Sequence, residues 1–174
     1  MQDQGPPTEG PARPLFVTEL ADVPVESQAS LLEAAVRRAF GGDHRRFERF
    51  VACLRAGLPE GTKIALRGSA VAGSSFVTGE PFDAAGSGTS DLDVVVIGTE
   101  AMGLFSPDAF YVPGVNSKPL CDATRWVAPD LDAVRTRAQA LVRRPVAIQA
   151  MAGWFLELRA VVQGQPHVLL DDAT

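Results

Sequence analysis

LRGSAVAGSS at residues 66–75 and SDLDVVV at residues 90–96 are the two stretches that decide the fold of this chain. The first predicts the end of a strand, a glycine turn and the start of a short helix. Glycine at position 68 lets the backbone approach a ligand closely. The free N–H groups at the start of the helix, together with the Ser69 hydroxyl, favour an anion such as a phosphate group.

The second stretch places two carboxylates at the start of a buried strand. Side chains at positions i and i+2 share one face of a strand, so Asp91 and Asp93 point the same way while Leu92 points into the core. Two parallel carboxylates repel each other unless a cation lies between them. Hard oxygen ligands next to phosphate favour Mg²⁺, which binds through one or two carboxylates and substrate oxygens. The pattern therefore predicts a magnesium site.

Each stretch alone has a simpler explanation. Gly-Ser turns are common, and Asp-x-Asp also occurs in many glycosyltransferases and in capped strands. The chain has no Walker loop and no strand-linked GxGxxG, which removes the common rival nucleotide-binding folds.

Taken together, the two stretches resemble the nucleotidyltransferase superfamily of the DNA polymerase β type, and its minimal single-domain branch in particular. The pattern of that superfamily is a hydrophobic residue, Gly-Ser, a short helix, and then Ser-Asp-hydrophobic-Asp leading into an apolar strand. Outside residues 66–97 the resemblance is only an order of elements, from Lys63 to about Asp171. The positions that match the pattern are Gly68, Ser69, Ala70, Gly73, Ser90, Asp91 and Asp93.

The resemblance implies transfer of a nucleoside monophosphate from an NTP to an acceptor hydroxyl, with release of pyrophosphate. Asp91 and Asp93 would hold Mg²⁺ against the phosphates, and the nucleotide-binding candidates are Gly68, Ser69, Arg67 and Ser90. Resembling proteins modify antibiotics, tRNA ends or proteins, so the acceptor is expected to be RNA (tRNA included), a protein or a small molecule. A partner protein or a second copy of the chain is expected where the single domain does not hold the acceptor alone.

Two departures from the pattern stand out. Residues 77–89 look like an inserted loop, which either shapes specificity or is a tolerated surface insertion. The second departure is in RPVAIQ at residues 144–149, where resembling proteins often read Arg-Pro-Val-Asp. Ala147 stands where they carry a third carboxylate, which binds a second metal and deprotonates the acceptor. Gln149 shares its face but is not a base; the candidate substitutes are Glu157, Asp171 and Asp83.

Two further functions stay open. One is a nucleotide-binding or partner-binding module that lost its catalytic power together with the third carboxylate. The other is a glycosyltransferase that uses Asp-x-Asp as its metal site, against which the short chain and the Gly-Ser helix argue. A basic rim for a triphosphate or RNA is a weaker hypothesis; its candidates are Lys118, Arg125, Arg135, Arg137, Arg143 and Arg144, with Arg37, Arg38, Arg45 and Arg46 as a second group.

The rest of the chain predicts an α/β (α+β) fold, a small mixed β-sheet with flanking helices and extra N-terminal helices. Helices are expected from Ser27 or Ser30 to Phe40, from Asp43 to about Leu54, from an N-cap at Asp130 to about Arg143, and over 153–162. Strands are expected at 63–67, 91–97, 146–150 and 168–170, and residues 98–129 are expected to be irregular.

Composition indicates an ordinary globular protein without a pronounced basic character. Apolar residues make up 46% of the chain, charged residues 21%, and the net charge is −5. Two cysteines, no apolar run near the roughly 20 residues of a membrane span and no secretory signal predict a cytoplasmic protein without a membrane partner. Residues 1–14, rich in proline and glycine, are expected to be a flexible leader before a single domain of residues 15–174.

Overall fold

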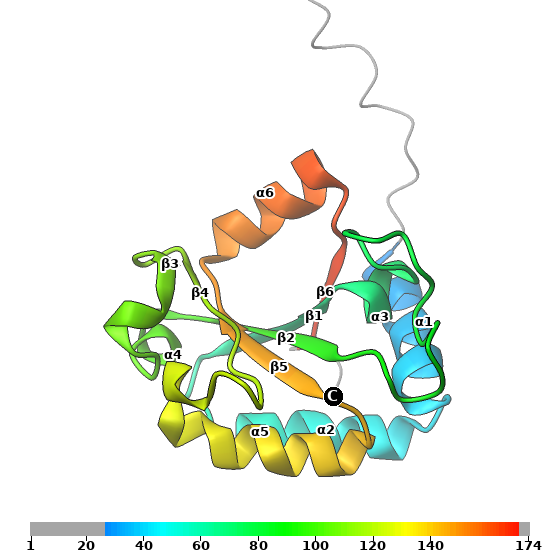
Figure 1. Ribbon diagram of the computed structural model, residues 1–174, viewed down its shortest axis with the longest axis horizontal. Helices are drawn as coiled ribbons and strands as arrows, with labels where there is room; N and C mark the ends of the chain where they lie inside the picture. The colour runs from blue at the N-terminus through cyan, green and yellow to red at the C-terminus, as the bar shows by residue number, and fades with distance from the viewer. Residues whose placement is uncertain (1–26, 171–174) are drawn as a thin grey trace, which may run out of the picture.

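The computed structural model describes residues 27–170, so the predicted leader at residues 1–14 lies outside the described residues. Within them, six α-helices accompany a four-stranded mixed sheet and a small two-stranded sheet (Figure 1). The helices are α1 (Gln28–Phe40), α2 (His44–Arg55), α3 (Ser69–Ala72), α4 (Thr99–Met102), α5 (Pro129–Val142) and α6 (Gly153–Gln163). The strands are β1 (Lys63–Arg67), β2 (Leu92–Ile97), β3 (Phe110–Val112), β4 (Asn116–Ser117), β5 (Val146–Ala150) and β6 (His167–Leu169). The predicted mixed sheet with flanking helices is thereby confirmed.

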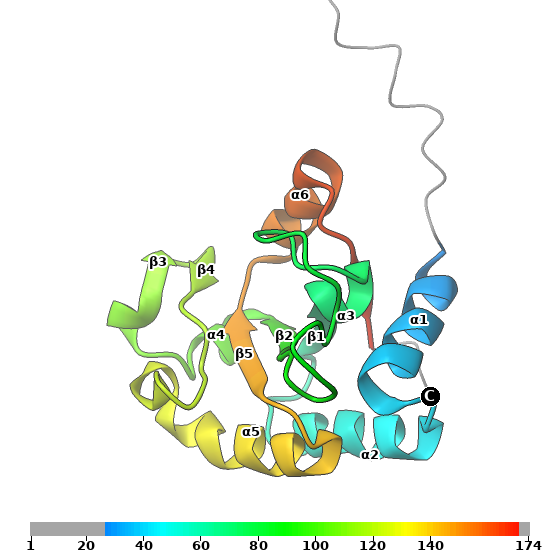
Figure 2. The same ribbon diagram turned by 45° about the vertical axis from the view of Figure 1, so that its right-hand side comes forward.

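The main sheet has the strand order β5-β2-β1-β6. Strand β1 is antiparallel to both β2 and β6, whereas β2 and β5 are parallel. Parallel neighbours need a crossover connection, and the chain between β2 and β5 contains α5. Figures 1 and 2 show α2 and α5 side by side on one face of this sheet and α6 on the opposite face.

The two faces of the sheet bury very different amounts of apolar surface. Alternate residues of β1 and β2, such as Ile64 and Val94, point into a large core shared with α1, α2 and α5. The aromatic rings of Phe40, Phe47 and Phe50 meet edge to face within it. On the other face, Leu156 of α6 packs in a cluster of only four buried residues, with Ala65, Val95 and Met151.

The ends of the first two helices follow local capping chemistry. The hydroxyl of Ser27 accepts a hydrogen bond from the backbone N–H of Ser30, and Gly41 ends α1 in the left-handed conformation. The Asp43 carboxylate accepts from the Arg46 N–H at the start of α2. Ser27, rather than the alternative start Ser30, is therefore the cap of α1, and Asp43, the expected start of the second helix, is the cap of α2.

Two expectations from the sequence are wrong in detail. Asp130 is not the N-cap of α5, because the helix begins with Pro129 and Asp130 lies in its first turn. Proline suits this first position since its missing N–H has no partner there in any helix. Residues 98–129, expected to be irregular, contain α4, the β3–β4 hairpin and two short 3-10 turns.

The outer edge of β6 is covered by a side chain. Gln28, the first residue of α1, donates its amide to the carbonyl of His167 and accepts from the N–H of Leu169. A side-chain amide thus makes the two hydrogen bonds that a neighbouring strand would make. No helix within residues 27–170 has the length and apolarity to cross a membrane.

Candidate functional site

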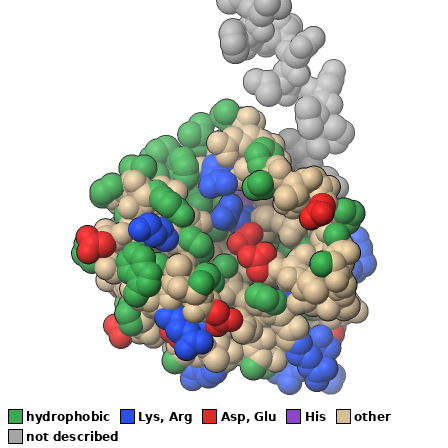
Figure 3. Space-filling model, viewed as in Figure 1, with side chains coloured by type: hydrophobic (Ala, Val, Ile, Leu, Met, Phe, Trp, Pro, Cys, Tyr) green, Lys and Arg blue, Asp and Glu red, His purple; other side chains and the backbone are tan. Residues whose placement is uncertain are grey.

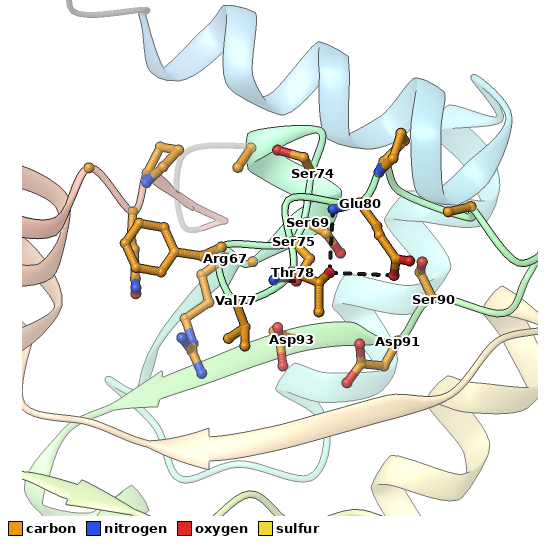
Figure 4. Close-up of a pocket in the computed structure, with 18 of the residues that line it drawn as sticks. Arg67, Ser69, Ser74, Ser75, Val77, Thr78, Glu80, Ser90, Asp91 and Asp93 are labelled. Carbon is orange, nitrogen blue, oxygen red and sulfur yellow. Dashed lines mark hydrogen bonds between the residues drawn. The ribbon is translucent and has the colours of Figure 1, made fainter.

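A cavity of about 940 Å³ opens at one end of β1 and β2, between the segment 74–90 and α6. Among its lining residues are six that the sequence singles out: Arg67, Gly68, Ser69, Ser90, Asp91 and Asp93. Figure 4 shows several of these side chains converging from β1, β2 and the segment 74–90. In the face of Figure 3, acidic side chains lie at the centre with basic ones directly beside them. The structure therefore brings the predicted site together.

Strand register sets the order of side chains across the floor of this cavity. Arg67 on β1 is in register with Asp93 on β2, and Asp93 is in register with Ala147 on β5. The three side chains form a row on the face of the sheet that carries α6. Ala147 is therefore the neighbour of Asp93, at the position expected for a third carboxylate.

Gly68 is required where β1 turns into α3. Its φ of +74° belongs to the region that favours glycine, and a Cβ there would lie 2.3 Å from Oδ2 of Asp93. Any side chain would displace the Asp93 carboxylate. Because α3 has only four residues, an anion here would be held by individual N–H groups and the Ser69 hydroxyl rather than by a long helix dipole.

The two carboxylates differ in environment. Asp91 is exposed, whereas Asp93 is partly buried at the cavity floor. Burial raises the pKa of Asp93 to about 6; the Arg67 charge opposes this rise, Asp91 adds to it and Arg159 opposes it. A divalent cation between the two carboxylates would offset the cost of burying the Asp93 charge and would reduce the repulsion between Asp91 and Asp93. The pair therefore fits Mg²⁺.

The described residues place Asp91 and Asp93, with Glu80 elsewhere in the lining, in one cavity. They contain no group of three or more histidine, cysteine, aspartate or glutamate side chains placed to hold a metal ion. A cation held by Asp91 and Asp93 alone needs further oxygens from water or from a ligand. This requirement suits Mg²⁺, which usually binds through one or two carboxylates and substrate phosphates.

Gln149 does not take the place of the third carboxylate. Its side chain is buried outside the cavity lining, donates to the Ser117 carbonyl and accepts from Nη2 of Arg67 at 2.9 Å. The Arg67 side chain therefore crosses over β2, which lies between β1 and β5. Its Nε is buried without a hydrogen-bond partner among the described residues. Gln149 thus fixes one end of the Arg67 guanidinium group, whose Nε–H has no acceptor among the described residues.

Arg159 on α6 is a site residue that the sequence analysis missed. It lines the cavity beside Arg67 and Asp93, and burial followed by the charge of Arg67 lowers its pKa while Asp93 opposes the change. Its Nε donates to Oε1 of Gln165 at 2.8 Å. Two arginines therefore face one cavity, an arrangement that favours an anionic ligand. The one signal in the sequence was that Arg159 follows Leu156 by three residues, which places both side chains on the same face of the helix.

Ser90 has a structural partner as well as a place in the cavity. Its hydroxyl accepts from the N–H of Asp83 at 2.7 Å, and its own N–H donates to the Asp83 carboxylate. Asp83 also accepts a bidentate pair of hydrogen bonds from Arg144, at 3.0 and 3.1 Å. Burial opposes ionisation of Asp83, but the hydrogen bonds from Arg144, Gly88 and Ser90 lower its pKa to about 2. Ser90 thus helps to hold the segment 74–90 in place.

The candidate substitutes for the third carboxylate do not reach the cavity. Asp83 is engaged with Arg144, and Glu157 is exposed on α6 with its carboxylate 3.3 Å from Nε2 of His167. Neither lines the cavity, and Asp171 lies outside the described residues. Neither of these two candidates within 27–170 therefore takes the place of the missing group, and the further acidic side chain in the cavity lining is Glu80, whose carboxylate accepts from the Thr78 hydroxyl.

The predicted basic rim is also only partly available. Arg135 is buried and paired with Asp122 and Asp132, and Arg144 is buried against Asp83. These two arginines stabilise the fold rather than forming a rim. Lys118 lies over the Trp126 ring, outside the cavity lining.

Comparisons of the chain with family models, with curated proteins and with solved structures give no match.

Proposed function

We propose that this protein is a nucleotidyltransferase, which transfers a nucleoside monophosphate from an NTP to an acceptor hydroxyl and releases pyrophosphate. One observation carries the proposal: two carboxylates, Asp91 and Asp93, share a cavity with Arg67 and Arg159 beside the Gly68–Ser69 turn. Paired carboxylates next to paired guanidinium groups suit a ligand that is a polyanion accompanied by a cation. As part of the proposal, we assign the sheet, with its turn after β1 and its carboxylates on β2, to the nucleotidyltransferase type of fold.

Each side chain has a role in this proposal. Asp91 and Asp93 would hold Mg²⁺, which would supply charge neutralisation at the phosphates when bound. Arg67 and Arg159 add positive charge where the leaving pyrophosphate gains negative charge, and Gln149 keeps Arg67 oriented. Gly68 and Ser69 offer N–H and hydroxyl donors to the phosphate tail. The chain therefore contributes mainly positioning and electrostatic stabilisation.

The chemical step is an in-line displacement at the α-phosphorus. A bond forms between the acceptor oxygen and phosphorus, the bond to the bridging oxygen of pyrophosphate breaks, and the acceptor loses one proton. With Ala147 at the third position, no carboxylate from β5 receives this proton, so it passes to water. The expected transfer is slow compared with that of a site that has its own base.

The second candidate function, a module that binds nucleotide without turnover, is favoured by the same alanine. Ala147 lies next to Asp93 and has no carboxylate, and Gln149 is hydrogen-bonded to Arg67 and Ser117. A protein that binds nucleotide but has lost the transfer reaction would have such a site. Binding and transfer therefore have to be measured separately.

The test is thermal unfolding with each of the four NTPs and with nucleotide-sugars, with and without Mg²⁺. An NTP at a hundred times its dissociation constant adds about 2.7 kcal/mol, a rise of several degrees. We expect this only with Mg²⁺, and we expect Asp91→Ala/Asp93→Ala to lose it. The matched control is Asp108→Ala/Asp130→Ala, which removes two exposed carboxylates from elsewhere.

Transfer is then measured with α-labelled NTP and candidate acceptors from RNA, protein and small molecules. Label on an acceptor supports the transferase. Magnesium-dependent binding without label on any acceptor supports the binding module. Stabilisation by nucleotide-sugars alone supports a glycosyltransferase, and no shift with any nucleotide would refute the site.

A further inference from the structure

The segment 74–90 places apolar side chains over a charged cavity floor. Phe76 is 62% exposed and Val77 is 92% exposed, and both line the cavity that contains Asp91 and Asp93. Figure 4 shows Val77 and Thr78 among the side chains drawn around Asp93. The further apolar lining on this wall comes from Pro81, Ala84 and Ala85. The cavity thus has a charged floor and, on the segment 74–90, a wall that carries apolar side chains among polar ones such as Thr78 and Glu80.

Main-chain hydrogen bonds close the tip of this segment. The N–H of Ser75 donates to the Glu80 carbonyl at 2.7 Å, and the N–H of Gly79 donates to the Ser75 carbonyl at 2.8 Å. A bridge joins Ser74 to Pro81, and the N–H of Phe82 donates to Gly73. The tip is therefore formed before any ligand arrives, which reduces the entropy lost on binding.

The two phenylalanines of the segment have different environments. Phe82 packs against the main core, and its ring lies 4.6 Å from the Arg144 guanidinium carbon. Phe76 belongs to neither core cluster of the described residues. Phe82 anchors the segment, whereas Phe76 contributes little to the core and leaves its ring free to contact a ligand.

We propose that Phe76 and Val77 form the base-binding surface of the site, with Phe76 as the stacking ring. A ligand that fits both sides of the cavity is a polyanion carrying a flat, weakly polar group, and a nucleoside triphosphate has this chemistry. Stacking tolerates every base because each has a π face, and larger purines stack better. The site therefore accepts all four NTPs and prefers ATP and GTP. This inference rests on the proposed function.

The experiment compares ligands with and without a base. Affinities of Mg²⁺ complexes of ATP, GTP, CTP, UTP and inorganic tripolyphosphate are measured by calorimetry for the wild type and for Phe76→Ala. We expect Phe76→Ala to weaken ATP and GTP by about tenfold or more and to leave tripolyphosphate unchanged. Phe76→Trp is expected to keep or increase the affinity for purines. Val161→Ala, which removes an equally exposed apolar side chain from α6 outside the cavity lining, is the matched control.

The outcomes separate this inference from the proposed function. Equal loss of ATP and tripolyphosphate in Phe76→Ala, or no loss of either, overturns the base-binding surface while leaving the phosphate site standing. A wild type that binds neither ATP nor tripolyphosphate overturns both. Because Phe76 is exposed, we expect the variant to fold, and Val77→Ala provides a second, milder change at the same surface.

Discussion

The carboxyl group of Asp93 lies against Gly68, close to the exposed carboxylate of Asp91, and burial raises its pKa to about 6. The folded state therefore holds a proton on Asp93 more tightly than the unfolded state, where the pKa is near its ordinary value of 3.8. By linkage, stability falls as the pH rises from about 4 to about 6, and above that window the loss is complete. A charged Asp93 at neutral pH thus costs about 2–3 kcal/mol of folding free energy.

This conflict between charge and burial gives a prediction for Asp93→Asn. Without Mg²⁺ at pH 7.5 we expect the variant to unfold several degrees higher than the wild type, and below pH 4 the difference should vanish. The same variant should lose stabilisation by Mg²⁺ with NTP. Asp91→Asn, at the exposed carboxylate, is the control and should gain less. Thermal unfolding across pH checks this, and an Asp93→Asn that is less stable at neutral pH would contradict it.

For single residues, the sequence predicted the site positions that follow from local structure. It did not predict the contacts between residues that are distant in the sequence. The cavity position of Asp91 and Asp93 follows from the two-residue period of a strand, and Gly68 follows from the turn. Arg159 reaches the cavity only because α6 covers that face of the sheet. Gln149 was placed on the correct face, but its hydrogen bond to Arg67 depends on strand order, which its local sequence does not contain.

Among the elements, the segment 74–90 depends on one ion pair for its position. Arg144 lies two residues before β5. It donates two hydrogen bonds to the Asp83 carboxylate and one to the Ser90 carbonyl. The exposed fractions of the Arg144 and Asp83 side chains are 6% and 18%, so the pair is poorly screened by solvent. The pair holds the segment that forms one wall of the cavity.

Removing one member of this pair leaves a buried charge without compensation. We expect Asp83→Ala to lower the free energy of unfolding by roughly 2–4 kcal/mol at pH 7. Asp83→Ala/Arg144→Met should lose less, because it leaves no unpaired charge. Since the pKa of Asp83 is lowered to about 2, its contribution is complete above pH 4 and disappears as the pH falls towards 2. Urea unfolding at pH 7 and pH 2.5 measures both effects; additive losses in the double variant would contradict the pairing.

Most of this segment was recognisable as a loop from its composition, but its fold was not. Glycine, serine and proline mark residues 77–89 as a loop. Its anchoring partner Arg144 is 61 residues from Asp83 in the sequence, and nothing local distinguishes it from the other arginines around it. The hairpin of β3 and β4 was missed for a related reason, since strands of two or three residues are too short to show a period.

In the molecule as a whole, the sheet is unequally protected on its two faces. The face that carries α1, α2 and α5 buries the large core, whereas α6 covers only the cluster around Val95 and Leu156. The outer face of α6 also exposes Trp154, Leu158, Val161 and Val162. A helix with so few buried contacts opens at a lower free energy than the rest of the domain.

We therefore expect backbone amides of α6 to exchange with solvent at least tenfold faster than those of α5, measured by hydrogen–deuterium exchange at neutral pH. Saturating NTP with Mg²⁺ should slow exchange in α6, because Arg159 and Leu156 line the cavity. Equal protection of α5 and α6 without ligand would show that the smaller cluster is as stable as the core.

The order of helices and strands was predictable because apolar residues recur with a period of 3.6 through α1, α2 and α5 and form short continuous runs in β1, β2 and β5. The two-residue period also predicts which residues of β2 face each side of the sheet. Which strands become neighbours, and that α6 lies alone on one face, depend on contacts between distant segments. Those contacts determine the shape of the cavity.

The amide of Gln28 has a consequence for how copies of this protein behave towards one another. An edge strand with free main-chain groups is a template for pairing with the strand of another molecule. At β6 the two groups that would begin such pairing, the His167 carbonyl and the Leu169 N–H, are already occupied by Gln28. The first turn of α1 therefore prevents a strand of another molecule from pairing with β6. If this turn frayed, the free edge of β6 would be exposed and aggregation could begin there.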